Sequence, residues 1–95
     1  METLMPPTEG QIKQTIQDLQ KRLADPLINQ KINRPVKEGY SESINVLAQH
    51  RITYDGIDQL TTLQGRAIAV LAVDYVKGEC SKEVLLGVKL KQPNR

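Results

Sequence analysis

The middle of the chain carries two local patterns that set the expected architecture. Asp55 and Gly56 stand between two short apolar-rich runs, residues 52–54 and 57–60. A two-residue hairpin turn needs positive φ angles, which glycine and aspartate tolerate, so this pattern predicts a β-hairpin. The same residues also fit a helix that begins at Ile57 with Asp55 as its N-cap. Both alternatives remain open from the sequence.

From Thr62 onward the two alternatives lead to the same helix. Residues 67–73 are apolar on every side, which in a helix indicates burial all round. Such a helix is either packed by the rest of a small domain or shared between subunits. The apolar run is too short to span a bilayer, which takes about 20 residues. Gly78, directly after Lys77, predicts the C-terminal end of this helix.

A further helix is predicted near the N-terminus. Thr8 and Gln11 form a capping-box pattern, and Pro26 marks the end of the helix. The apolar residues make a narrow stripe of coiled-coil type: Ile12, Ile16, Leu19 and Leu23. The stripe either docks on the core of the same domain or pairs with another helix, in a second copy or in a partner protein. Residues 1–7 are predicted to form a flexible arm.

Two residues break the helical pattern between these helices. Pro35 biases the residue before it toward an extended conformation, and Gly39 is a turn signal. We therefore expect an irregular stretch around them. A short helix over residues 43–50 is expected to follow, with Ser41 or Ser43 as its N-cap.

Toward the C-terminus, apolar residues recur at every second position over residues 84–90, which predicts a strand with a charged outer face. A short helix capped by Ser81 is the alternative. Residues 92–95 are expected to fray. The expected fold is a single domain over residues 8–91, of the α+β class and mainly helical. Its elements are an N-terminal amphipathic helix, a short helix, a β-hairpin or helix start, a buried apolar helix and a C-terminal strand.

Composition and charge add two expectations. The chain has 95 residues, and three tyrosines are its only aromatic residues. Because a mainly aliphatic core buries less area per side chain, we expect a second copy to complete it in a homo-oligomer. The net charge is +2, but one stretch opposed only by Asp25 holds five cations: Lys21, Arg22, Lys31, Arg34 and Lys37. Such a stretch fits either a polyanionic partner or an ordinary solvated surface.

The sequence offers little catalytic chemistry. Cys80 is the single cysteine, which excludes an intrachain disulfide and a site of several thiolates. His50 is the single histidine and belongs to no nucleophile motif, and the chain has no glycine-rich phosphate loop. We therefore expect a protein that is not an enzyme and has no catalytic residues, metal or cofactor. The absence of a secretion-signal pattern favours the cytoplasm and no membrane partner.

The function that these observations favour is that of a small protein-binding module, such as an adaptor, inhibitor or assembly factor. It is expected to act as a homo-oligomer through a helical or strand-edge surface. The predicted interaction residues are those of the N-terminal stripe: Ile12, Ile16, Leu19 and Leu23. Small chains from phages, plasmids and other mobile elements are often of this type.

A DNA-binding regulator is the alternative. Residues 62–67, Thr-Leu-Gln-Gly-Arg-Ala, are similar to the Thr-x-x-Gly-Arg-Ala that follows the wing in regulators of the MarR-type winged-helix family. The resemblance implies that residues 43–50 form the recognition helix and that the hairpin forms the wing. The residues that would contact DNA are then Lys37, Asn45, Gln49 and Arg51. The cations, however, lie mainly in residues 21–37 and not on the wing, which favours the protein-binding module.

Overall fold

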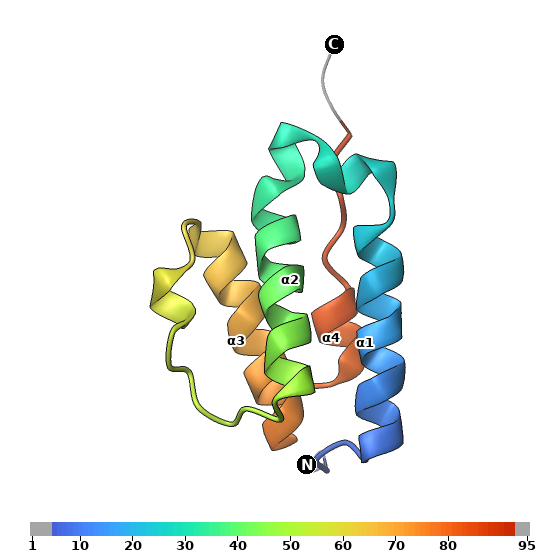
Figure 1. Ribbon diagram of the computed structural model, residues 1–95, viewed down its shortest axis with the longest axis vertical. Helices are drawn as coiled ribbons and strands as arrows, with labels where there is room; N and C mark the ends of the chain where they lie inside the picture. The colour runs from blue at the N-terminus through green and yellow to red at the C-terminus, as the bar shows by residue number, and fades with distance from the viewer. Residues whose placement is uncertain (1–4, 93–95) are drawn as a thin grey trace.

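All regular structure in residues 5–92, the part of the chain that the computed structural model describes, is helical (Figure 1). The three long helices have 15 residues each: α1 (Glu9–Leu23), α2 (Arg34–Ala48) and α3 (Leu63–Lys77). A short helix and three 3-10 turns complete the fold: α4 (Lys82–Leu86), η1 (Pro26–Asn29), η2 (Lys31–Asn33) and η3 (Ile57–Gln59). The predicted α+β class is therefore wrong, because these residues contain neither the hairpin nor the C-terminal strand.

Helix α1 begins and ends where the sequence indicates. The backbone N–H of Thr8 donates to Oε1 of Gln11 at 2.8 Å, and the backbone N–H of Gln11 donates to Oγ1 of Thr8 at 3.2 Å. This reciprocal capping box satisfies two donors of the first turn. The helix ends at Leu23, three residues before Pro26. Residues 1–4 and 93–95, which hold most of the predicted arm and tail, lie outside the described residues.

Helix α2 is longer than predicted, because the two supposed breakers lie inside it. Pro35 is in its first turn, where a missing backbone N–H removes no intrahelical bond. Gly39 lies in its interior and faces α3. A Cβ atom built on Gly39 would be 2.7 Å from Cβ of Ile68 and 3.0 Å from the backbone oxygen of Gly65. The glycine therefore permits close helix packing and is not a turn residue, and the predicted helix over residues 43–50 is only the second half of α2.

Helices α2 and α3 pack side by side and run in the same direction (Figure 1). A Cβ on Gly65 would meet the backbone oxygen of Pro35 at 3.2 Å, while Gly39 meets Ile68 one turn further along both helices. The connection over residues 49–62 must therefore return along the whole length of the pair. That length is about 22 Å for 15 residues.

This return path explains why residues 51–60 form neither a hairpin nor a continuous helix. A hairpin would bring its two ends together, whereas here they lie at opposite ends of the helix pair. Gly56 adopts a positive φ of 85°, and η3 follows it as a single 3-10 turn. Leu60 is then extended, and Thr62 starts a new helix by accepting a hydrogen bond from the backbone N–H of Gly65 at 3.0 Å. Helix α3 ends at Lys77 with Gly78 as its C-cap, as the sequence predicts.

The C-terminal segment forms α4 and an extended tail. Ser81 caps α4, so the alternative helix is confirmed and the predicted strand over residues 84–90 is wrong. The described residues provide no other strand for it to pair with. The tail is held by Asn33, whose Nδ2 donates to the backbone oxygen of Lys91 at 2.8 Å and whose Oδ1 accepts from the backbone N–H of Lys91 at 2.8 Å.

The core lies between the three long helices and α4. Two of the three tyrosines, Tyr40 and Tyr75, are buried in it. The hydroxyl of Tyr75 lies 2.9 Å from Oγ1 of Thr15, and every buried side-chain nitrogen or oxygen among residues 5–92 has a hydrogen-bond partner. None of the described helices has the length and apolarity needed to cross a membrane.

Candidate functional site

The predicted interaction stripe of α1 is turned toward the core of the same chain. Ile12 and Leu19 are 6% and 0% exposed, and Ile16 and Leu23 are partly buried against the core. The stripe therefore docks on its own domain, which was one of the two alternatives that the pattern allowed. These side chains do not form a free surface for a partner helix.

The four residues that the winged-helix resemblance assigned to DNA contact are not arranged as that family requires. The wing is absent from residues 51–60. Arg51 instead holds the connection in place, because it pairs with Glu42 at 2.9 Å and donates to the backbone oxygen of Asp55. Asn45 is exposed in the last turn of α2, and Gln49 is exposed at the C-cap of that helix. Lys37 lies two turns before Asn45 on the same helix, and its Nζ donates to Oδ1 of Asn29 at 2.8 Å.

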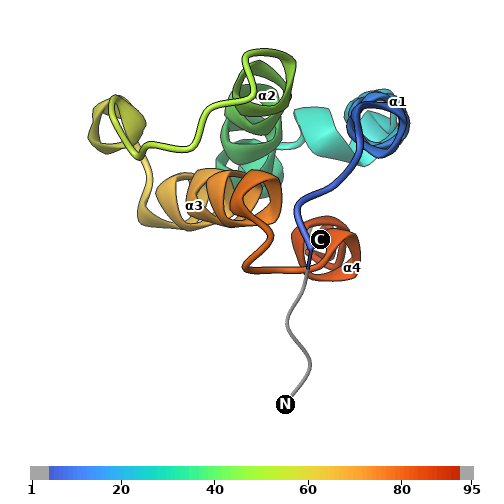
Figure 2. The same cartoon turned by 90° about the horizontal axis from the view of Figure 1, so that it is seen from below.

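An apolar stripe on the outer side of α3 remains uncovered. We call it the α3 face; it consists of Leu63, Ala67, Val70 and Leu71. The i, i+4, i+7, i+8 spacing places these residues on one side of the helix. Leu63 is 80% exposed and Ala67 is exposed, while Val70 and Leu71 are partly buried at the edge of the core. Figure 2 shows α2 against one side of α3 and no helix against the opposite side.

The sequence contained a signal for this surface, namely a helix that is apolar on every side. Packing by one small domain buries only part of such a helix: Ile68, Ala69, Ala72 and Val73 enter the core. The apolar residues of the α3 face, on the other side of the helix, are exposed or only partly buried. The helix is therefore not buried all round within one chain, and its sharing between subunits stays a prediction.

Glu38 fixes the start of the α3 face relative to α2. Its carboxylate accepts four hydrogen bonds, from the backbone N–H and the hydroxyl of both Thr61 and Thr62. The donors from Thr61 lower the pKa of Glu38 from 4.5 to about 2. Thr62 is also the N-cap of α3. The carboxylate thus positions the helix end that carries Leu63.

The other end of α3 is fixed by contacts with the connection. The hydroxyl of Tyr54 donates to Oδ1 of Asp74. Nζ of Lys77 lies 3.0 Å from the same hydroxyl and 4.9 Å from the centre of the Tyr54 ring. The hydroxyl of Tyr54 and the carboxylate of Glu79 raise the pKa of Lys77. Both ends of α3 are therefore held by side chains outside the α3 face.

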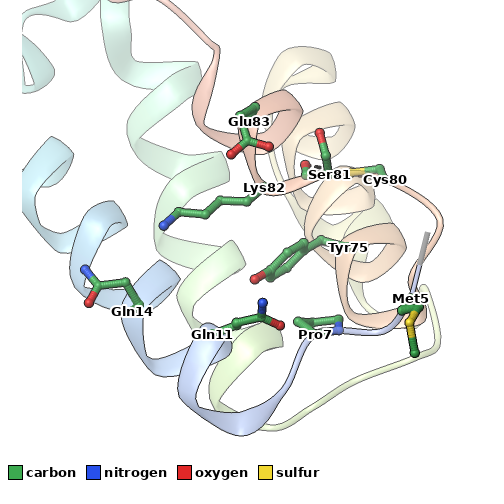
Figure 3. Close-up of a pocket in the computed structure, with 9 residues that line it drawn as sticks. All are labelled: Met5, Pro7, Gln11, Gln14, Tyr75, Cys80, Ser81, Lys82 and Glu83. Atoms are coloured by element: carbon green, nitrogen blue, oxygen red, sulfur yellow. Dashed lines mark hydrogen bonds between the residues drawn. The ribbon is translucent and has the colours of Figure 1, made fainter.

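A shallow cavity of about 320 Å³ lies between α1, the end of α3 and the start of α4 (Figure 3). In Figure 3 the hydroxyl of Tyr75 points toward Gln11, and Lys82 extends from α4 toward α1. Lys82 is paired with Asp18 at 2.6 Å. Burial raises the pKa of Cys80, so its thiol is a poor nucleophile. The residues around the cavity therefore join α1, α3 and α4, as the pair of Lys82 and Asp18 does. The one thiol among them, that of Cys80, is not activated.

Metal ligands are not grouped in the described residues: no three histidine, cysteine, aspartate or glutamate side chains could hold an ion together. Comparison with protein-family models, with curated proteins and with solved structures found no match to this chain.

Proposed function

We propose that this chain is a non-enzymatic protein-binding module that acts through the α3 face, with a second copy of the chain as its partner. The observation that carries the proposal is Leu63, a leucine that is 80% exposed and lies in line with three other apolar residues of α3. The stripe is exposed at Leu63 and Ala67 and only partly buried at Val70 and Leu71, and a contiguous apolar patch on a small protein marks an interaction surface more often than scattered single residues do.

The arrangement of the α3 face fits a two-fold contact. Ala67 lies midway between Leu63 and Leu71 along the helix. If two copies of α3 cross in antiparallel orientation at Ala67, the small side chain allows close approach of the backbones. Leu63 of each copy then packs against Leu71 of the other. The same patch serves both copies, which is the requirement for a closed dimer.

The charge and the area of the α3 face determine how tightly two copies are expected to associate. None of the four residues of the α3 face is charged, so pairing these four side chains buries no ion, and Asp74, three residues after Leu71 on the same side of α3, is hydrogen-bonded to Tyr54. The face is narrow compared with the roughly 800 Å² per partner of a standard interface. We therefore expect a reversible dimer with a dissociation constant of about 1–100 μM.

Sedimentation velocity over about 1–300 μM protein tests the proposal. The wild-type weight-average sedimentation coefficient is expected to rise with concentration from the monomer toward the dimer. Leu63→Glu should keep the chain monomeric while leaving its thermal unfolding unchanged, because glutamate is favourable in the first turn of a helix. Val84→Glu is the matched control, since Val84 is 51% exposed on α4 and is not part of the α3 face.

Two outcomes would overturn the proposal. A wild-type chain that stays monomeric at every concentration removes the dimer. An equal loss of association in Leu63→Glu and Val84→Glu places the contact elsewhere.

The remaining parts of the proposal concern chemistry and compartment. His50, the single histidine, is exposed in the left-handed region after α2, and Cys80 has a raised pKa. These two residues therefore support a non-enzymatic role. A lone cysteine also suits a reducing compartment, and we propose the cytoplasm as the place where the module acts.

A further inference from the structure

One end of the molecule gathers most of its cations. We call it the basic end; it consists of Lys21, Arg22, Lys31, Arg34, Lys37, Lys89 and Lys91, all of which are exposed. They come from the last turn of α1, from η2, from the start of α2 and from the C-terminal tail, which meet at the top of Figure 1. Residues 21–37 and 87–91 contain these seven cations and a single carboxylate, that of Asp25, so their formal charge is +6. With a total of +2, the rest of the sequence carries −4.

Asn33 holds these segments together. Its side chain is 0% exposed and donates to the backbone oxygens of Leu27 and Lys91, while it accepts from the backbone N–H of Lys91. Asn33 precedes α2, yet its side chain makes no capping bond to that helix. It is used instead to fix the C-terminal tail beside η1. The cations of the tail are therefore held next to those of η2 and α2.

The cations of the basic end are not explained by ion pairs, and those at the start of α2 are not explained by helix stability, whereas Lys21 and Arg22 in the last turn of α1 suit the dipole of that helix. No cation of the basic end has an ion-pair partner among residues 5–92, whereas Lys13, Arg51, Lys77 and Lys82 do. Arg34 and Lys37 lie in the first four residues of α2, and no acidic residue occupies that turn. A cation at a helix N-terminus is opposed by the helix dipole. Placing cations there favours a bound anion instead.

The dimensions and composition of the basic end fit the phosphate backbone of a nucleic acid duplex. The molecule measures 27 × 25 Å across its long axis. A duplex of that length presents about 15 phosphates, which exceeds the number of cations available. Tyr40 and Tyr75 are buried, and Tyr54 contacts α3, so the tyrosines do not provide a stacking platform at this end. Contacts to phosphates would therefore be independent of base sequence.

We propose that the basic end is a binding site for the phosphate backbone of double-stranded nucleic acid. The site shares no residue with the α3 face, so it does not depend on dimer formation. Of the residues that the winged-helix resemblance implied, it retains only Lys37. The other three, Asn45, Gln49 and Arg51, lie in the last turn of α2 or after it, away from these cations.

The test is fluorescence anisotropy of a labelled random-sequence 25-base-pair duplex, titrated with the full chain at several salt concentrations. Binding is expected to weaken steeply with salt, by about 0.9 in log affinity per log salt for each phosphate neutralised. The triple variant Lys31→Gln/Arg34→Gln/Lys37→Gln should lose roughly tenfold or more in affinity and reduce the salt slope by about 2 to 3. Circular dichroism confirms that this variant is folded.

Matched single variants locate the site. Lys31→Gln and Lys13→Gln each remove one exposed lysine, and only Lys31→Gln is expected to lower the affinity and reduce the salt slope by about 1. The proposal is overturned by no duplex binding at low salt, by unchanged binding of the triple variant, or by equal effects of the two single variants. Tighter binding of poly-glutamate than of the duplex would also overturn it and identify an acidic protein surface as the ligand.

Discussion

Glu38 and Thr61 are joined by two hydrogen bonds that connect the second turn of α2 to the residue before the N-cap of α3: the backbone N–H of Thr61 donates at 2.9 Å, and its hydroxyl donates at 2.7 Å. The carboxylate receives two further bonds from Thr62, the N-cap of α3. One acidic side chain of α2 thus fixes the end of the connection over residues 49–62 to the helix that precedes it.

We expect Glu38→Gln to reduce the free energy of unfolding by about 1 kcal/mol, because a neutral amide accepts these bonds more weakly and places an N–H against one pair of donors. Urea denaturation at neutral pH measures this. Glu83→Gln, an exposed change on α4, is the control and should have little effect.

The same carboxylate predicts a pH dependence. The pKa of Glu38 is lowered in the folded chain from 4.5 to about 2, so its ionised form stabilises the fold fully above the unfolded value. That stability is lost as the pH falls from about 4.5 to about 2. The difference in unfolding free energy between wild type and Glu38→Gln should shrink over this range. A difference that stays constant down to pH 2 would contradict the assigned role.

Gly39→Ala should destabilise the chain although alanine is the better helix former. The new Cβ would be 2.7 Å from Cβ of Ile68 and 3.0 Å from the backbone oxygen of Gly65, which forces α2 and α3 apart. Overpacking of this kind costs about 1–3 kcal/mol. Gly10→Ala is the control, because the nearest atom to its Cβ is 4.0 Å away, and it should be neutral or slightly stabilising. Thermal unfolding of both variants distinguishes packing from propensity.

Asn33→Ala should free the C-terminal tail. The change removes three hydrogen bonds and leaves the backbone oxygen and the backbone N–H of Lys91 without their partner, at a cost of about 1–3 kcal/mol. Limited trypsin digestion should then cut faster after Lys89 and Lys91 than in the wild type. The exposed change Asn45→Ala serves as the control. Equal cleavage rates in wild type and Asn33→Ala would show that the tail is not held by this side chain.

Leu19 is buried and Leu63 is exposed, so replacing each of them by alanine tests which residues belong to the core and which to the surface. Leu19 is 0% exposed, and Leu19→Ala is expected to cost about 2–5 kcal/mol of unfolding free energy. Leu63 is 80% exposed, and Leu63→Ala should change the stability of the monomer by less than about 0.5 kcal/mol. Chemical denaturation below about 1 μM separates these effects from dimer formation. A large loss for Leu63→Ala at that concentration would place this residue in the core.

Local chemistry in the sequence determined where several helices begin and end. The capping box of Thr8 and Gln11, the N-cap at Thr62 and the C-cap at Gly78 each act through hydrogen bonds or backbone angles within a few residues. Such features can be predicted from the sequence because they do not depend on contacts with distant residues. The apolar stripe of α1 and the all-round apolar character of α3 were equally visible, because helical periodicity is a local property.

Tertiary structure decided what those local patterns could not. Pro35 and Gly39 have the same local preferences in a loop as in α2, and only the approach of Ile68 and the backbone of Gly65 shows why the glycine lies inside a helix. Residues 51–60 could not form a hairpin because two parallel helices require a connection that spans their length. The candidate surfaces were decided in the same way. The packing of α2 against one side of α3 leaves Leu63 uncovered, and the hydrogen bonds of Asn33 bring cations from distant segments to one end.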